Sequence, residues 1–221
     1  MNCNTSTKLI IAVACGLAQL TTGIAAAADS GFLPDYSRLE TARDDNGKKV
    51  ERWVSPTFTK VNYKKILIEP VAFYPAPKGS EQVSDQALAD IQGYLDSQLR
   101  TVGLAAIPQV SAAGPGVARV RVGITAVATS AVGLKPWQII PIALVAQGAK
   151  AATGRRAKDA ELAVEALITD SVSNAPLAMV VRKADGVTLP DSKTQLTLDT
   201  VRPTIDRWAA NVAEQVRQRI N

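Results

Sequence analysis

ARVRVGITA, residues 118–126, is the part of this 221-residue chain from which its fold can be worked out. Small or branched apolar residues alternate there with polar ones. Neighbouring side chains of a β-strand point to opposite faces of a sheet, so Arg119, Arg121 and Thr125 lie on one face. The other face is apolar and is expected to meet the core through Ala118, Val120, Val122, Ile124 and Ala126. The pattern predicts a half-buried strand.

A second alternating run begins at Glu161, with Glu165 and Thr169 on its polar side and Leu162, Val164, Ala166 and Ile168 on its apolar side. A third strand is predicted at 177–183, after a turn at 173–176. If the first two strands are antiparallel neighbours, Arg119 and Arg121 can face Glu161 and Glu165. Such cross-strand pairs contribute about 0.2–1 kcal/mol each.

Toward the N-terminus, the apolar run at 64–71 predicts a strand buried on both faces. Apolar residues at three- and four-residue steps predict an amphipathic helix over 84–102, capped by Ser84, and another over 203–220, with Pro203 at its first position. The order strand, helix, strand, insertion, two strands, helix predicts an α+β fold. In this fold a mostly antiparallel sheet carries two amphipathic helices packed on one face.

Residues 1–28 have the pattern of a signal peptide: a start with one cation, an apolar middle and small residues at the end, with cleavage expected after Ala28. An alternative is lipid attachment at Cys15, which follows a short apolar run.

We expect an irregular N-terminal arm at 29–56 and a single α+β domain at 57–221 with an apolar insertion at 134–158. In the arm, Asp44-Asp45-Asn46-Gly47 is interpreted as a turn rather than a calcium loop, since the glycine comes too early.

Composition excludes several kinds of catalysis. The chain has no histidine, and both cysteines, Cys3 and Cys15, lie in the leader. A Ser-His-Asp triad, a thiol nucleophile and the usual zinc sites are therefore excluded, and no cofactor is expected. A pair of carboxylates from Asp170, Asp185 and Asp191 is left as the one hydrolytic possibility. The net charge of +5 is spread along the chain and aromatic residues are few, so no nucleic-acid partner is expected.

Two segments are candidates for contact with a partner or a membrane. The insertion combines the apolar Trp137, Ile139 and Ile140 with a basic exit formed by Lys150, Arg155, Arg156 and Lys158. It can rest on a membrane surface, or it can fold as a buried helix between strands, which we favour. The arm carries Phe32 and Tyr36, which either fasten it to the domain, as we favour, or dock another protein.

The run Ser30-Gly31-Phe32-Leu33-Pro34-Asp35-Tyr36-Ser37-Arg38-Leu39 resembles the opening signature of DUF3313, a family of bacterial envelope proteins. The similarity continues through 63–71, 119–125, 137–154 and 165–170. Many members are putative lipoproteins with a cysteine shortly before this signature, where this chain has Ala25 to Ala28. The resemblance implies an envelope location and no particular activity.

These observations predict an exported protein, periplasmic or associated with the outer membrane. Our leading hypothesis is a non-enzymatic module that binds another envelope protein during envelope maintenance or assembly. The alternatives are a peripheral membrane or lipid-binding protein that uses the insertion at 134–158, and a histidine-free carboxylate hydrolase. A deep apolar cavity would favour lipid binding, two converging acids would favour hydrolysis, and a flat surface would favour the protein-binding module.

Overall fold

The structure is a computed structural model that describes residues 29–44, 46–77, 79–80, 82–131, 158–184, 187–189 and 194–220. In chain order its elements are β1 (Glu40–Arg43), β2 (Lys49–Val54), β3 (Lys65–Ile68), β4 (Ala72–Phe73), α1 (Asp85–Gln98), the π-helical η1 (Leu99–Gly103), β5 (Val117–Ala131), β6 (Lys158–Asp170), β7 (Pro176–Lys183), β8 (Val187–Leu189) and α3 (Leu198–Ile220).

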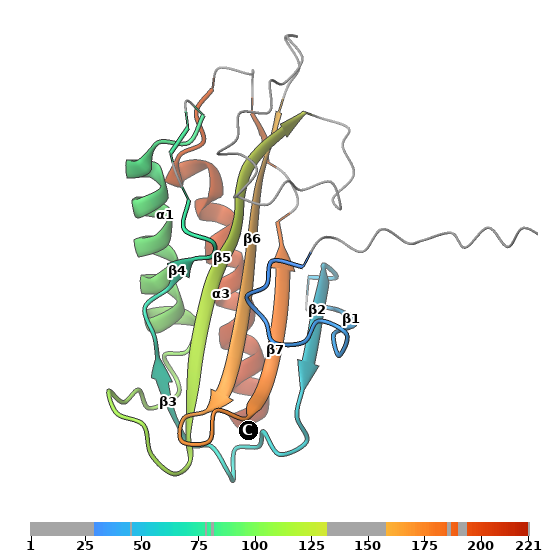
Figure 1. The fold of residues 1–221 in the computed structure, drawn as a ribbon, viewed down its shortest axis with the longest axis vertical. Coiled ribbons are helices and arrows are strands. Elements are labelled where there is room, and N and C mark those ends of the chain that lie inside the picture. The colour runs from blue at the N-terminus through green and yellow to red at the C-terminus, as the bar shows by residue number, and fades with distance from the viewer. Residues whose placement is uncertain are drawn as a thin grey trace, which may run out of the picture.

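The described strands form one eight-stranded sheet with the order β1-β2-β7-β6-β5-β3. Short strands extend it, since β4 pairs with β5 and β8 pairs with β6. Only β3 and β4 run parallel to their neighbour β5, and every other described pair is antiparallel. The helices α1 and α3 lie side by side against one face of the sheet (Figure 1). The predicted α+β architecture is confirmed.

The alternation in β5 is confirmed as far as Ile124. A β-bulge between Ile124 and Ala126 then shifts it, and Val127, not the predicted Ala126, belongs to the core cluster beyond it. The other four predicted core residues are buried in that cluster, and Ile124 has no exposed surface. The predicted stripe of α1 faces them, with Ile91 fully buried. Ser84 caps α1 as expected, because its side chain accepts a hydrogen bond from the backbone N–H of Ala87 at 3.1 Å.

The antiparallel pairing of β5 with β6 is confirmed, but the predicted charge pairs across it are wrong. Arg119 lies opposite Thr169, and Arg121 lies opposite Leu167. Both arginines instead reach Glu69, at 3.7 Å and 3.2 Å between Nε and the carboxylate oxygens. The observed register keeps each strand's apolar side on the helix-covered face. The predicted register is shifted from it by an even number of residues and would bury the same side, and the exposed ion pairs it would add are worth only about 0.2–1 kcal/mol each.

The last helix begins five residues before the predicted start. Thr197 precedes its first turn, where the Thr197 N–H bonds the Thr200 hydroxyl at 3.3 Å. Pro203 therefore lies inside α3 instead of at its first position. Because proline has no N–H, the carbonyl four residues earlier lacks its helical donor at that point.

The segment 29–56 is not wholly irregular. Its second half forms the β1–β2 hairpin, and β2 pairs with β7 through Glu51 to Val54. The predicted turn joins the two strands, with the Gly47 N–H bonded to the Asp44 carbonyl at 2.8 Å and Gly47 at a φ of 73°. The hairpin thus belongs to the same sheet as the rest of the domain. Of the predicted insertion at 134–158, only Lys158 lies within the described residues, as the first residue of β6.

Candidate functional site

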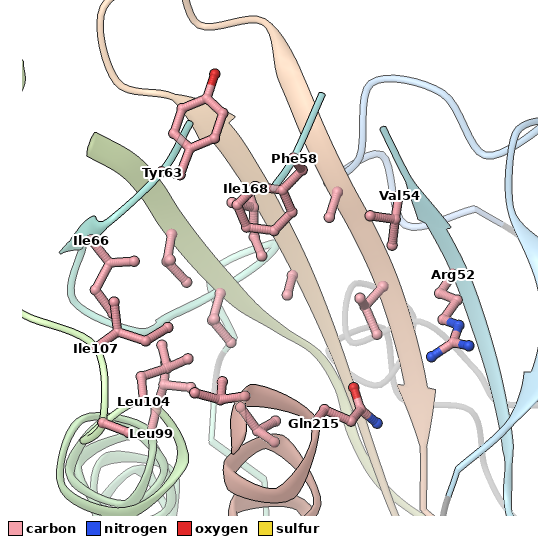
Figure 2. Close-up of a pocket in the computed structure, with 18 of the residues that line it drawn as sticks. Arg52, Val54, Phe58, Tyr63, Ile66, Leu99, Leu104, Ile107, Ile168 and Gln215 are labelled. Carbon is pink, nitrogen blue, oxygen red and sulfur yellow. The ribbon is translucent and has the colours of Figure 1, made fainter. Parts of the chain in front are cut away.

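An apolar cavity lies between the sheet and the helices, with a volume of about 470 Å³ (Figure 2). Its walls are the helix-facing side chains of β2, β5, β6 and β7 together with residues of η1 and α3. Most of them are aliphatic: Val50, Val54, Ile66, Leu95, Leu99, Leu104, Ile107, Val120, Val122, Val164, Ala166, Ile168, Ala178, Val180, Ala209, Val212 and Val216.

The cavity follows from the relative widths of the two layers. The six strands of the main path span about 24 Å between the outer two, at about 4.8 Å per neighbour. Two helices about 10 Å wide cover roughly 20 Å of it. The helices are also drawn together, because a Cβ at Gly103 of η1 would lie 3.4 Å from Val212 of α3. Short side chains such as Ala166 and Ala178 do not fill the space left under β6 and β7.

Besides Arg182 and the polar residues of segment 59–64, two polar side chains line this apolar space from opposite layers. Arg52 comes from β2 and Gln215 comes from α3, and both are seen in Figure 2 beside the cavity. Among the residues that the structure describes, neither side chain has a hydrogen bond or salt-bridge partner. A cationic and an amide group at an otherwise apolar pocket are the kind of polar groups that orient a bound ligand.

A polar cluster around Asp44 adjoins the cavity at Arg182. Arg182, which also lines the cavity, donates to Asp44 Oδ2 at 3.0 Å, and the Asn211 side chain donates to the same oxygen at 2.8 Å. Asp44 Oδ1 accepts from the backbone N–H groups of Asn46 and Lys48. Burial alone would raise the pKa of Asp44, but these hydrogen bonds and the Arg182 charge lower it below its ordinary value. The cluster ties the hairpin, β7 and α3 into one frame.

The cavity is also bordered by Phe58 and Tyr63, whose rings pack edge to face at 5.7 Å. Tyr63 donates to Asp170 Oδ2 at 3.0 Å, while the other carboxylate oxygen accepts from the backbone of Val172 and Ser173. The Ser173 N–H is the largest cause of the lowered pKa of Asp170. Asp170 therefore holds the β6–β7 turn. Asp185 and Asp191, the other acids of the hydrolase hypothesis, lie outside the described residues.

The arm packs on the face of the sheet opposite the cavity. The Tyr36 hydroxyl donates to Glu165 Oε2 at 2.6 Å and accepts from the backbone N–H groups of Phe32 and Leu33 at 3.1 and 3.2 Å. Burial first, and then the bond to Glu165, raise the pKa of Tyr36. The Phe32 ring lies on Gly123, where a Cβ would come within 2.7 Å of the ring. Phe32 and Tyr36 thus both make contacts within the chain.

Sequence reasoning missed the cavity residues on β2. The run KVERWV at 49–54 alternates, but we interpreted it as part of the irregular arm. Recognising it as a strand would have placed Val50, Arg52 and Val54 on one face. The remaining predicted contact residues, Trp137, Ile139, Ile140, Lys150, Arg155 and Arg156, lie outside the described residues.

Comparison with known proteins decides the family. The model of the family described as "Protein of unknown function (DUF3313)" matches residues 28–212. The chain belongs to the DUF3313 family. Two relatives, each named "Uncharacterized lipoprotein YdcL", come from Escherichia coli K12 and O157:H7. Each is 36% identical over 182 residues, which is 82% of either chain. The lipoprotein relatives indicate that this is an exported, envelope-associated protein.

Among solved structures, a PelC dodecamer from Paraburkholderia phytofirmans aligns with a TM-score of 0.37 at 10% identity, covering 74% of this chain and 98% of the other. A likeness this weak carries no inference about function or assembly. Within the described part of this DUF3313 chain, no helix is long and apolar enough to cross a membrane. The same residues contain no cluster of three or more acids that could hold a metal ion.

Proposed function

We propose that this DUF3313 protein is a non-enzymatic envelope protein that holds the acyl chain of an amphipathic lipid in the cavity between its sheet and helices. The observation that supports the proposal is the cavity itself. Its volume of about 470 Å³ lies in the range of small-molecule sites, roughly 300–1,000 Å³, and its walls are almost entirely aliphatic. A deep apolar cavity is the feature that separates lipid binding from the protein-binding and hydrolytic alternatives.

The free energy available is sufficient for specific binding. Burying one methylene contributes about 0.8 kcal/mol, so twelve methylenes contribute about 10 kcal/mol before any cost. Association and ordering oppose this by at least about 4 kcal/mol. The difference corresponds to a dissociation constant in the micromolar range or weaker, to which a head-group contact adds.

Arg52 supplies that contact. Its guanidinium has no hydrogen-bond or salt-bridge partner within the described residues, and it lines the cavity beside the aliphatic Val50 and Val54 of the same strand. A carboxylate or phosphate head would accept hydrogen bonds from it in pairs, and Gln215 could donate from the facing helix. The proposed ligand is therefore a single-chain lipid, or one chain of a larger lipid, with an anionic head.

The sequence hypothesis of a protein-binding accessory module also stays a proposal. The lipid-binding alternative was attached to the insertion at 134–158, which lies outside the described residues. The present proposal uses a different part of the chain, since β2, β6, β7 and α3 form the cavity. Lipid binding is compatible with a role in envelope maintenance, because a protein can serve the envelope by binding one of its lipids.

Displacement of a fluorescent fatty acid from the purified protein tests the proposal. Ala166→Phe projects a ring into the cavity, whereas Ala89→Phe makes the same change on the exposed face of α1. We expect Ala166→Phe to weaken binding at least about tenfold and Ala89→Phe to leave it unchanged, with both melting temperatures recorded. Arg52→Gln should weaken palmitate and leave hexadecanol unaffected. Equal binding by the wild type and Ala166→Phe, or no binding by the wild type, would reject the proposal.

A further inference from the structure

We infer that one end of the molecule docks on an anionic membrane surface. This end, called here the loop end, consists of residues 55–64, 104–116 and 171–175, which connect β2 to β3, η1 to β5, and β6 to β7. The three segments lie together at the bottom of Figure 1. The inference concerns a surface, so it does not depend on whether the cavity holds a lipid.

Hydrogen bonds hold the three segments together as one surface. The backbone N–H of Lys64 donates to the carbonyl of Gly116 at 3.1 Å. The N–H of Gly114 donates to the Ser171 hydroxyl at 3.1 Å, and that hydroxyl donates back to the Gly114 carbonyl at 3.0 Å. The positions of their exposed side chains are therefore set by the sheet and not by independent loops.

The charge of the loop end is of one sign. Its three segments contain no Asp or Glu, and they contribute Lys60 and Lys64, with Lys65 directly following at the start of β3. All three lysines are exposed. Asp170, which directly precedes the third segment, accepts hydrogen bonds from Tyr63 and from the turn that it caps. The three segments therefore bring positive charge and no acid to this surface.

Apolar side chains project from the same surface. Val61 is 75% exposed between Lys60 and Lys64, and Val172 is 62% exposed at the tip of the adjacent β6–β7 turn. Single exposed valines are ordinary. Two exposed valines on neighbouring segments, one of them flanked by lysines, match the composition of a surface that inserts shallowly among lipid head groups.

A bilayer fits this surface better than a protein partner does. Protein interfaces are enriched in arginine and large aromatic residues and depleted in lysine. The exposed charges of the loop end are all lysine, and its aromatic side chains, Phe58 and Tyr63, are partly buried against each other. Lysines near an anionic membrane each add attraction that falls with ionic strength.

Docking would also place the cavity against the membrane. Phe58, Lys60, Tyr63 and Lys64 belong both to the loop end and to the cavity lining. If the cavity holds an acyl chain, as proposed above, its ligand would enter directly from the bilayer. This consequence rests on the proposed function, whereas docking does not.

Vesicle co-sedimentation tests the inference. The full chain with Cys3→Ser and Cys15→Ser, purified from the envelope fraction, has no thiol that could carry a lipid anchor. It is mixed with vesicles of phosphatidylglycerol and phosphatidylcholine, or of phosphatidylcholine alone, at low and high salt. We expect binding to the anionic vesicles that is roughly tenfold stronger than to the neutral ones and is lost at high salt.

Variants locate the contact. Lys64→Glu with Lys65→Glu, and separately Val61→Asp, should lower binding roughly tenfold or more. Lys49→Glu is the matched control, since Lys49 is exposed at the far end of β2, about 20 Å from the loop end. Ala166→Phe should bind vesicles like the wild type, which separates docking from cavity occupancy. The inference would be overturned if the protein with an unaltered loop end did not co-sediment with anionic vesicles. It would also be overturned if Lys49→Glu weakened vesicle binding as much as the loop-end variants do.

Discussion

Tyr36→Phe is the substitution whose effect the structure defines best. It removes one oxygen atom and keeps the ring. The hydroxyl donates to Glu165, a carboxylate that is only 4% exposed, and that bond is the one hydrogen bond to the Glu165 side chain among the described residues. The hydroxyl also accepts the N–H groups of Phe32 and Leu33. One oxygen thus joins the arm to the sheet.

The loss can be estimated from these contacts. A hydrogen bond to a charged group contributes about 1.5–3 kcal/mol, and a buried carboxylate without its donor adds to the cost. Water can replace the hydroxyl at the partly exposed arm amides, so they add little. We expect the free energy of unfolding to fall by about 3 kcal/mol. For a chain of this size, that corresponds to a melting temperature lower by about 6–12 °C.

Urea unfolding followed by tryptophan fluorescence measures the change, because Trp53 packs in the same cluster as the arm. Tyr63→Phe is the control. It removes a similar bond to Asp170, but Asp170 keeps the Val172 and Ser173 donors, so a loss below about 1 kcal/mol is expected. A Tyr36→Phe loss no larger than that of Tyr63→Phe would refute the reasoning.

Alkaline pH gives an independent check. The pKa of Tyr36 is raised in the folded chain, first by burial and then by its bond to Glu165. Its neutral hydroxyl therefore contributes stability that is complete below the ordinary tyrosine pKa of about 10 and is lost as the pH rises through the raised value. Wild-type protein should show this alkaline loss, and Tyr36→Phe should show less of it.

Two further substitutions test the Asp44 cluster beside the cavity and the packing of the Phe32 ring on Gly123. Asp44→Asn should destabilise the fold in denaturant unfolding by up to about 3–5 kcal/mol, because it removes the buried carboxylate charge that pairs with Arg182. The lowered pKa of Asp44 adds stability above the ordinary aspartate pKa of about 4 that is lost as the pH falls through the folded value. The variant should therefore lose less stability on acidification than the wild type does. Gly123→Val should displace the Phe32 ring, because the valine side chain would occupy the space that the ring fills. The backbone amides of the arm should then exchange with solvent faster, while the sheet stays folded. Arm amides that exchange as slowly as in the wild type would contradict this packing.

The spacing of apolar residues predicted the sheet and both helices, because burial of apolar side chains decides which face of each element points inward. The buried faces of β5, α1 and β6 were predicted for this reason. Register is a finer property. The arginines of β5 pair with Glu69 instead of β6, because shifts by an even number of residues keep the same faces buried and differ little in energy. The hairpin was missed because its strands are short and rich in charge.

The candidate site could not be predicted from local pattern. Val164, Ala166 and Ile168 have the same spacing whether a helix covers them or a cavity does. The cavity arises from the width of the sheet relative to the two helices and from the close approach of η1 to α3 at Gly103. Arg52 also gave no signal, since a charged residue on a short strand is ordinarily solvated.

Native mass spectrometry of the protein purified from the envelope without detergent tests the central claim most directly. The claim predicts a bound species with the mass of an anionic lipid that organic solvent releases and that Ala166→Phe lacks. A wild-type mass that extraction does not change, or an equal loss of mass from Ala166→Phe, would contradict it.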